Sequence, residues 1–298
     1  MIKAGRIGHA TFETPDLDKA IDHYAEILGL VVVAREKDRA YLGSRLGLLS
    51  LALEKSGQQR CTRLSFEIAP TISLADAAKA LAEDGIPAEL RNDTAPGLSQ
   101  VLSFVDPKGT AIDLFSEGKP VAPISDAVGT GVLKFGHLAF VVEDPTSIAQ
   151  FYQRVLGFRV SDWIEDWFVF LRCNADHHVV NFIRGPQARM HHMAFEVKDF
   201  AHLQTGCEVL GNRGIPISWG PVRLGPGHNV AIFHRNADDQ MVEFYAELDQ
   251  MKDEDLGYFD PRPWHRDQPQ RPKVWTGNTR YMWGPPPTPD FLRTQVSN

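Results

Sequence analysis

The sequence predicts an α+β protein made of a tandem repeat, in which each half contains a pair of β-α-β-β-β modules and forms one barrel-like domain. The first observation is that the second half of the 298-residue chain repeats the pattern of the first half. The second is that each half alternates between short strand-like segments and two amphipathic helical segments. The third is that Pro, Trp, Arg and Gly become frequent after about Leu248. We therefore expect repeats at residues 1–122 and 131–248, followed by an arm at residues 249–298.

The two halves align in a nearly constant register. GHATF aligns with GHLAF at a shift of 128 residues, so that His9 falls on His137. The helical segments that follow keep this shift, since Tyr24 falls on Tyr152. Later segments align at a shift of 129, RLSFEI on HMAFEV, and at a shift of 130, AIDLF on MVEFY. Because the shift changes so little, few insertions separate the copies, and residues of one half have counterparts in the other.

Each half presents its elements in the same order. A short alternating strand that carries His9 or His137 is followed by a turn with Asp and Pro and by a helix that ends at a glycine, Gly29 or Gly157. Three strand-like segments follow, VVVARE, AYLGS and LLSLALE in the first half and FRVSDWI, WFVFLR and HVVNFIR in the second. A further strand, a helix and more strands complete each half. Such modules curl into half-barrels whose concave faces enclose a cavity, while the helices pack outside.

The arm shows neither a helical nor a strand period. Its composition therefore predicts extended chain that lies over the body of the protein. One interpretation is an ordered surface tail. The other is that Trp264, Trp275 or Trp283 anchors a contact between subunits or covers the mouth of the cavity.

Composition and charge favour small-molecule chemistry. The chain carries 31 basic and 38 acidic residues without a basic block, so we expect neither a nucleic acid partner nor binding to an anionic membrane surface. The amino terminus lacks the apolar core of a signal peptide, and no stretch approaches the roughly 20 apolar residues of a membrane span. Three cysteines without CxxC spacing indicate neither a disulfide framework nor a thiolate zinc site. We expect a cytoplasmic protein.

Alternation along three strands of the second repeat directs two histidines and a glutamate to one cavity. A strand sends successive side chains to opposite faces. In HHMAFEV the apolar row must face the helices, which assigns His191 to the outer face and leaves His192 pointing into the cavity. The same alternation turns His137 inward in GHLAFVV, and it turns Glu243 and Tyr245 inward in MVEFYAE.

Two imidazoles and one carboxylate on a rigid sheet match the facial ligand set of non-haem Fe(II), which leaves three positions open. We therefore expect His137, His192 and Glu243 to bind one ion, Fe²⁺, with Mn²⁺ accepted by the same ligands. The alternative is that they are unrelated polar residues with satisfied hydrogen bonds. In the first repeat Arg63 stands at the position of His192, and a guanidinium has no lone pair to offer a metal. We expect no metal there, and an ion pair between Arg63 and Asp113.

Five motifs carry a resemblance to a known family, namely GHLAFVV, CNADHHVVNF, MHHMAFEV, GPGHN and VEFYAELD. Through them the chain resembles the type I extradiol ring-cleavage dioxygenases of the vicinal oxygen chelate superfamily, in particular the catechol 2,3-dioxygenases and 2,3-dihydroxybiphenyl 1,2-dioxygenases. The resemblance covers nearly the whole chain. It implies the vicinal oxygen chelate (glyoxalase-like) fold and an Fe²⁺ ion held by His137, His192 and Glu243. It also implies a small aromatic diol and O2 as substrates, ring opening next to the diol, and a homo-oligomeric assembly.

The resemblance implies roles for further residues. His178, the second histidine of CNADHHVVNF, matches the family histidine that manages protons beside the O2 position, and Tyr245 matches a pocket tyrosine that can hydrogen-bond a substrate oxygen. Two pocket positions depart from the family, because Leu224 replaces the usual histidine and Phe233 the usual tyrosine. His228 is near them in sequence, but alternation along the strand gives no assurance that it replaces either.

Two functions are compatible with these departures. The first is an extradiol dioxygenase in which His178 alone handles protons, while Leu224 and Phe233 form an apolar wall for a bulkier or differently placed ring. The second is a non-oxidative lyase, isomerase or hydrolase of the same fold that uses the metal as a Lewis acid. A non-catalytic binding protein is disfavoured because all three predicted ligands are present. We favour the first function, since a site that had lost its reaction would be free to lose its ligands.

Overall fold

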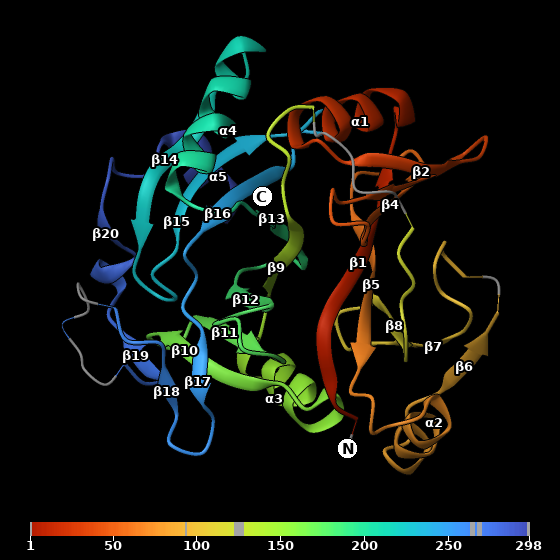
Figure 1. Ribbon diagram of the computed structural model, residues 1–298. Coiled ribbons are helices and arrows are strands. Elements are labelled where there is room, and N and C mark those ends of the chain that lie inside the picture. Colours follow the sequence, from red (N-terminus) through yellow and green to blue (C-terminus); the bar gives the residue numbers. More distant parts are fainter. Residues whose placement is uncertain (1, 93, 122–127, 263–265, 267–269, 297–298) are drawn as a thin grey trace.

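The two halves form two open, curved sheets that lie side by side (Figure 1). The computed structural model describes residues 2–92, 94–121, 128–262, 266 and 270–296. The first sheet has eight strands in the order β2-β3-β4-β1-β5-β8-β7-β6, and the second has ten in the order β19-β10-β11-β12-β9-β13-β16-β15-β14-β20. The predicted α+β tandem repeat is confirmed, although neither sheet closes into a barrel within the described residues.

The first repeat contains eight strands and two α-helices, the first of which continues into a π-helical turn, η1. Its elements are β1 (Ala4–Thr14), α1 (Leu17–His23), η1 (Tyr24–Leu28), β2 (Val31–Arg35), β3 (Arg39–Gly43), β4 (Leu49–Lys55), β5 (Cys61–Ile68), α2 (Leu74–Glu83), β6 (Ala88–Arg91), β7 (Val101–Val105) and β8 (Ala111–Phe115).

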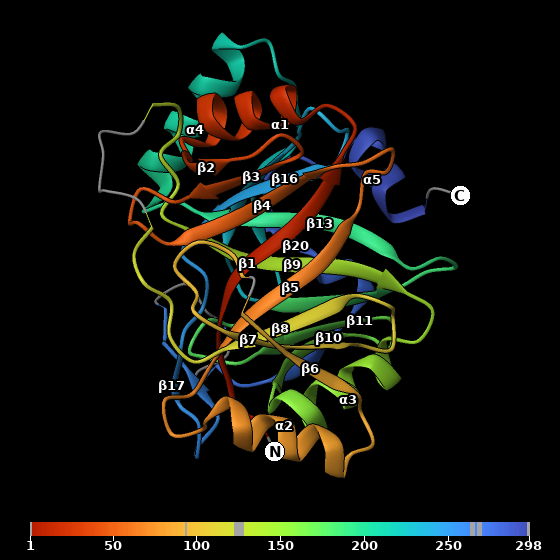
Figure 2. The ribbon, with the colours of Figure 1, turned by 90° about the vertical axis from the view of Figure 1, so that its right-hand side faces the viewer.

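The second repeat has the same order of elements. They are β9 (Lys134–Val142), α3 (Pro145–Leu156), β10 (Arg159–Ile164), β11 (Phe168–Arg172), β12 (Val180–Arg184), β13 (Arg189–Glu196), α4 (Phe200–Asn212), β14 (Ile217–Leu224), β15 (Val230–Arg235) and β16 (Met241–Ala246). In both repeats the first strand pairs antiparallel with the fifth, and the fifth pairs parallel with the eighth. Figure 2 shows α1 and α4 at one end of the molecule and α2 and α3 at the other, with the strands between them.

The first helix of each repeat has defined ends. Asp16 and Asp144 cap α1 and α3 by accepting hydrogen bonds from backbone N–H groups of the first turn. The helical segments end at Gly29 and Gly157, whose φ angles of 79° and 72° lie in the left-handed region that favours glycine. A Cβ atom at Gly29 would also lie 2.3 Å from the carbonyl oxygen of Val128, so this end of the helix packs closely against the linker between the repeats.

Two buried tyrosines at equivalent positions join the repeats. Tyr24 of the first repeat accepts a hydrogen bond of 2.9 Å from Asn236 of the second. Tyr152 of the second repeat donates one of 2.8 Å to Asp106 of the first. Around these contacts one large apolar core contains side chains from both repeats, including the outer rows of β9, β13 and β16. The helical segments that carry Tyr24 and Tyr152 therefore contact the opposite repeat as well as their own.

The carboxyl-terminal arm contains more regular structure than its composition predicts. It forms β17 (Met251–Asp253), β18 (Tyr258–Phe259), β19 (Lys273–Trp275), a short 3-10 helix η2 (Gly277–Thr279), β20 (Tyr281–Trp283) and α5 (Pro289–Val296). The expectation of purely extended chain is wrong because η2 and α5 are helical. The extended segments β19 and β20 pair with β10 and β14, so that the arm extends both edges of the second sheet. Trp264 lies outside the described residues, Trp275 bonds Asp162 of β10, and Trp283 lies half exposed over Arg223.

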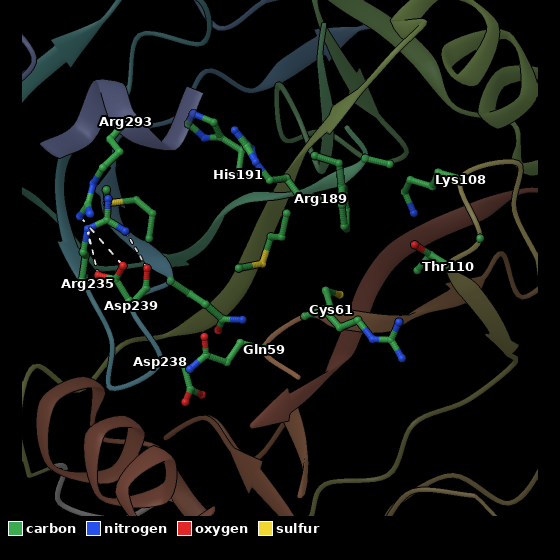
Figure 3. Close-up of a pocket in the computed structure, with 17 residues that line it drawn as sticks. Gln59, Cys61, Lys108, Thr110, Arg189, His191, Arg235, Asp238, Asp239 and Arg293 are labelled. Atoms are coloured by element: carbon green, nitrogen blue, oxygen red, sulfur yellow. Dashed lines mark hydrogen bonds and ion pairs between the residues drawn. The ribbon is translucent and has the colours of Figure 1, made fainter. Parts of the chain in front are cut away.

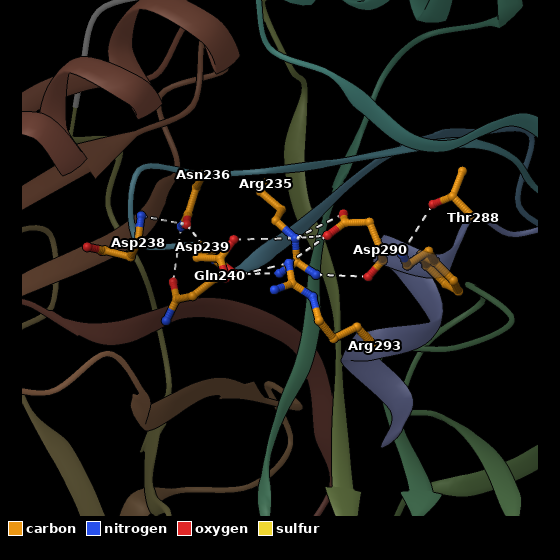
Figure 4. A network of polar contacts seen from close by, with 9 residues as sticks. Arg235, Asn236, Asp238, Asp239, Gln240, Thr288, Asp290 and Arg293 are labelled. Atoms are coloured by element: carbon orange, nitrogen blue, oxygen red, sulfur yellow. Dashed lines mark hydrogen bonds and ion pairs between the residues drawn. The ribbon is translucent and has the colours of Figure 1, made fainter. Parts of the chain in front are cut away.

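Helix α5 is held to the second repeat by charged and polar contacts (Figure 4). Arg235 at the end of β15 donates to both carboxylate oxygens of Asp290, at 2.9 and 3.0 Å. Arg293 bonds the same carboxylate at 2.7 Å, and Thr288 donates to the carbonyl oxygen of Ser218. These contacts fix Phe291, which lies between them, against the second sheet.

Two further observations concern the helices and the cysteines. No helix in the described part of the chain combines the length and the apolar character needed to cross a bilayer. Cys61, Cys173 and Cys207 are all free thiols.

Two stacked histidines, His23 of α1 and His234 of β15, lie buried between the repeats. Their ring centroids are 5.4 Å apart, and His234 also contacts the ring of Phe244. His23 Nε2 and both ring nitrogens of His234 have no hydrogen-bond partner among the described residues. Burial lowers the pKa of His23 to about 4 and that of His234 well below its ordinary value, so both are neutral at neutral pH.

Because these histidines are buried in their neutral form, we expect the free energy of unfolding to decrease in mild acid. In the unfolded chain each has a pKa of about 6.5, so the stability that depends on their neutral form is complete above that pH and is lost as the pH falls toward the folded values. We expect metal-free protein to lose about 2 kcal/mol per histidine between pH 7 and pH 5, measured by urea unfolding. A His23→Phe/His234→Phe variant should lose correspondingly less, whereas a His202→Gln control should behave as wild type. Equal losses in all three proteins would contradict this origin.

Candidate metal centre

Three side chains of the second repeat converge on one point. His137 Nε2 of β9 lies 3.1 Å from Glu243 Oε2 of β16. His192 Nε2 of β13 lies 3.2 Å from the same oxygen and 3.3 Å from His137 Nε2. All three side chains are buried. The structure thus brings together the three residues that the sequence analysis predicts as metal ligands.

Strand pairing explains this convergence. Ala194 of β13 pairs with His137 on one side and with Glu243 on the other. His192 stands two residues before Ala194 and therefore points to the same face of the sheet. The small side chain of Ala194 leaves space in front of the sheet, into which the three longer side chains extend.

The distances and charges fit a divalent cation. Three atoms at about 2.1 Å from one ion lie about 3.0 Å apart at right angles and about 3.4 Å apart in a tetrahedron, and the observed distances fall between these values. Burial lowers the pKa of His137, which favours its neutral form. Burial opposes ionisation of Glu243, but the attraction of His137 and hydrogen bonds from both histidines outweigh it and lower its pKa to about 2. The donor set is therefore two imidazole nitrogens and one carboxylate oxygen.

Asn229 supports the carboxylate. Its Nδ2 donates a hydrogen bond of 2.8 Å to Glu243 Oε1. The second oxygen, Oε2, is the atom that faces both histidines. This arrangement directs one carboxylate oxygen to the metal position and occupies the other.

The first repeat lacks an equivalent cluster. In the described chain the three residues above are the only group of at least three His, Cys, Asp or Glu side chains close enough to share an ion. The predicted ion pair between Arg63 and Asp113 is confirmed. Arg63 also bonds Ser103, and His9 Nε2 lies 3.2 Å from Ser65 Oγ. A guanidinium side chain thus occupies the first repeat at the position where the second presents a histidine.

His191 does not follow the alternation that the sequence analysis assumes. A β-bulge between Met190 and His192 inserts one extra residue into β13, so the expectation that His191 faces the helices is wrong. Its Nδ1 lies 2.7 Å from Nδ1 of His192. If His192 binds a metal through Nε2, its Nδ1 carries the hydrogen and donates it to His191. His191 is then the residue that orients this ligand.

His178 stands beside the cluster. It lies just before β12, and its ring centroid is 4.3 Å from that of His137. Burial lowers the pKa of His178 well below its ordinary value, and the neighbouring histidines His137, His177 and His192 lower it further. A neutral imidazole therefore faces the same space as the three converging atoms.

The cluster opens into a cavity of about 70 Å³ with mainly apolar walls. Leu224 and Phe233 both line it, as the sequence analysis expects. The arm adds Arg280 and Phe291, and the Phe291 ring packs 4.9 Å from that of Phe233. The remaining lining residues are His137, Ile164, Trp167, Phe168, Phe170, His178, Asn181, His191, His192, Trp219, Pro226 and Glu243.

The structure does not bring Tyr245 and His228 to this cavity. Tyr245 is buried below His137, with ring centroids 5.1 Å apart, and its hydroxyl lies over Gly136, where a Cβ atom would approach it to 1.9 Å. His228 has a φ of 49°, which turns its side chain toward Asp249, and its Nδ1 lies 2.6 Å from that carboxylate. Tyr245 thus packs against a ligand, and His228 belongs to a separate ion pair.

A larger cavity of about 570 Å³ lies between the repeats (Figure 3). Its lining includes Cys61 and Lys108 of the first repeat and Arg189 and Arg235 of the second. His191 belongs to the lining of both cavities, so the bulge in β13 lies between them.

Residues 134–255 match the family model described as the Glyoxalase/Bleomycin resistance protein/Dioxygenase superfamily. The matched residues include His137, His192 and Glu243 of the metal cluster. The resemblance on which the sequence analysis relies is therefore confirmed at the level of the superfamily.

Comparisons with individual proteins extend the match to the whole chain. The 2,2',3-trihydroxybiphenyl dioxygenase of Sphingomonas paucimobilis is 22% identical over 294 residues, which cover 91% of this chain and 96% of that protein. The Mn(II)-bound glyoxalase from Novosphingobium aromaticivorans has a TM-score of 0.83 at 22% identity, over 98% of this chain and 94% of that one. A complex of homoprotocatechuate 2,3-dioxygenase from Brevibacterium fuscum with 3,4-dihydroxyphenylacetate has a TM-score of 0.80 at 22% identity, over 98% and 92%. The chain has the fold of these proteins.

A matched pair of variants tests the metal site. His137→Ala removes one of the converging atoms, whereas His9→Ala removes its counterpart in the first repeat. We expect the first variant to bind Mn²⁺ more than about 100-fold more weakly, since loss of a mere orienting partner already costs about 10- to 100-fold. The second should bind as wild type. Calorimetric titration with Mn²⁺ and elemental analysis after anaerobic loading with Fe²⁺ measure this. Undiminished metal binding in His137→Ala would exclude the site.

The bulge makes a separate prediction. His191→Phe keeps a ring beside Phe291 but removes the acceptor for Nδ1–H of His192. We expect metal affinity to fall about 10- to 100-fold without being abolished, measured by the same titration. If the affinity of this variant equals that of wild type, His191 does not orient the ligand.

Proposed function

We propose that the protein is an Fe²⁺-dependent extradiol dioxygenase that opens a catechol-type ring next to its two hydroxyl groups with O2, and that Mn²⁺ is the second metal its ligands accept. The observation that carries this proposal is the neutral imidazole of His178, which stands against His137 in the same buried cavity as the three converging ligand atoms. A metal site with three open positions beside a proton acceptor suits a substrate that must lose protons to chelate.

The residues present fit the metal. His137, His192 and Glu243 would hold it, and Asn229 keeps the carboxylate oriented. A bound ferrous ion would be chelated by both oxygens of the diol and would let electrons pass from the ring to O2. The chain itself supplies the orientation of the ligands, the exclusion of water and the transfer of protons.

Proton transfer falls to His178. A diol at the metal position lies within the cavity that His178 lines, and the lowered pKa of His178 keeps it neutral and able to accept a proton near pH 7. Leu224 and Phe233 cannot donate or accept a proton, so these two positions of the cavity lining offer no second acid or base. We therefore assign to His178 both the acceptance of the substrate proton and its later return.

The cavity walls favour an aromatic diol with an apolar substituent. Phe168, Phe233 and Phe291 present ring surfaces to the cavity. Arg280 lines it as well, with its guanidinium 4.9 Å from the ring centroid of Trp167. Apolar walls of this kind exclude water from the reacting groups and bind a second ring or an alkyl group by burial.

A non-oxidative metalloenzyme is the second candidate. Leu224 and Phe233 remove two polar groups from the pocket wall, and a Mn(II)-bound glyoxalase shares the fold. In such an enzyme the metal would act as a Lewis acid, and His178 would move a proton to or from carbon.

An O2-uptake assay separates the two candidates. Protein loaded anaerobically with Fe²⁺ is given catechol, alkylcatechols and 2,3-dihydroxybiphenyl, and both O2 consumption and the yellow ring-opened product are followed. Stoichiometric uptake with one of these diols supports the dioxygenase. Fully loaded protein that consumes no O2 with any diol contradicts it and favours the second candidate.

His178→Ala tests the assigned proton acceptor. We expect kcat to fall by about 100-fold or more, because a general acid–base contributes factors of this size, while the Fe²⁺ content stays that of wild type. His228→Ala, which alters a histidine near in sequence but outside the cavity lining, should keep most of the activity. Activity that survives in His178→Ala would assign proton transfer to another group.

A further inference from the structure

Each of the two histidine doublets of the second repeat makes the same kind of contact, between its two Nδ1 atoms. In the doublet His177–His178 the two Nδ1 atoms lie 3.0 Å apart, and in the doublet His191–His192 they lie 2.7 Å apart. Two nitrogens at this distance form a hydrogen bond only if one carries a hydrogen and the other does not. The partners of each doublet therefore decide which nitrogen of the second histidine is bare.

The first doublet is anchored by Asp162 of β10. This buried carboxylate accepts from the backbone N–H of Lys273 at 2.8 Å and from Trp275 Nε1 at 2.5 Å, and both of these groups can only donate. His177 Nε2 lies 3.1 Å from the same Oδ2 that accepts from Trp275. Since both oxygens of Asp162 serve as acceptors, the hydrogen in this contact belongs to His177 Nε2.

The remaining assignment follows along the chain of contacts. When His177 carries a single ring hydrogen, that hydrogen is on Nε2 and a lone pair is left on Nδ1. His178 Nδ1 must then donate to it, which leaves Nε2 of His178 without a hydrogen. Gly227 leaves space for this arrangement, because a Cβ atom there would lie 3.1 Å from His177 Nδ1 and 3.2 Å from His178 Cε1.

We infer that Asp162 and His177 are positioning residues, which hold neutral His178 in the Nδ1–H tautomer so that a bare Nε2 can accept a proton from the substrate. The Nδ1 contact sets which nitrogen is free, because the hydrogen bond made by one ring nitrogen fixes the state of the other. The second doublet has the same polarity, since His192 would use Nε2 for the metal and donate from Nδ1 to His191. In each doublet the first histidine orients and the second acts.

The carboxyl-terminal arm supplies two of the hydrogen bonds that hold Asp162. Lys273 and Trp275 lie on β19, which pairs with β10 beside Asp162. Their two N–H groups keep the carboxylate in place as an acceptor. The arm thus contributes to the state of His178 without reaching the cavity at this point.

The tautomer can be measured without turnover. In metal-free protein labelled with ¹⁵N-histidine at neutral pH, two-bond ¹H–¹⁵N correlations show which ring nitrogen is protonated, and the His178→Gln spectrum identifies the signals of His178. We expect wild-type His178 to carry its hydrogen on Nδ1. Asp162→Asn and His177→Phe should each shift His178 toward the Nε2–H form, while Asp162→Glu should restore the wild-type spectrum. Asp113→Asn, a buried Asp→Asn change in the first repeat, should leave it unchanged.

The catalytic consequence rests on the proposed function and is measured separately. With Fe²⁺ bound to the same extent as in wild type, Asp162→Asn should lower kcat about 100-fold, since the wrong tautomer offers no lone pair to the substrate. An Nε2–H signal for His178 in the wild-type protein overturns the inference, whatever the activity. An Nδ1–H signal without O2 uptake on any diol supports the inference and contradicts the dioxygenase proposal.

Discussion

Two buried hydrogen bonds, related by the repeat itself, hold the halves of this protein together. Tyr24 and Tyr152 are counterparts in the repeat, and so are their partners Asn236 and Asp106. Each tyrosine crosses to the other half, so each first helix is fixed to both sheets. The outer rows of the strands then share one apolar core, while residues of the concave face of the second sheet form a separate cluster around Phe233. The concave faces are left free to hold polar groups.

The two concave faces hold different polar groups at equivalent positions. The first sheet places Arg63 against Asp113, and the second places His192 near Glu243. A guanidinium brings its own positive charge to a buried carboxylate, whereas a neutral imidazole leaves that charge to be supplied by an ion. The exchange between a guanidinium and an imidazole at this position therefore distinguishes a filled structural site from a site that can bind a metal.

The sequence predicts those parts of the site that depend on regular strands. Alternation places His137, His192 and Glu243 on one face because Ala194 of β13 pairs in register with His137 of β9 and with Glu243 of β16. It fails at His191, where a bulge adds a residue that no pattern of polar and apolar residues reveals. This error arises because alternation assumes that each residue of one strand faces one residue of the other, whereas a bulge adds a residue to one strand only.

Contacts between distant segments are also beyond such patterns. The roles of Asp162 and Phe291 depend on β10 and α5 meeting the cavity region, which no local spacing encodes. His228 lies outside the cavity lining because its positive φ turns its side chain toward Asp249, which no pattern of polar and apolar residues reveals. The fold itself was accessible because the repeat supplies two copies of each element, and a departure in one copy is visible against the other.

The three predicted metal ligands are not oriented in the same way. His192 is oriented by His191 and Glu243 by Asn229, but His137 Nδ1 has no hydrogen-bond partner in the described part of the chain. Ring contacts hold His137 instead, since His178 and Tyr245 pack on it at 4.3 and 5.1 Å. A shift of His178 would therefore disturb a ligand as well as the proton acceptor. Keeping His178 in one orientation, through its bond to His177, stabilises both the geometry of the metal position and the direction of proton transfer.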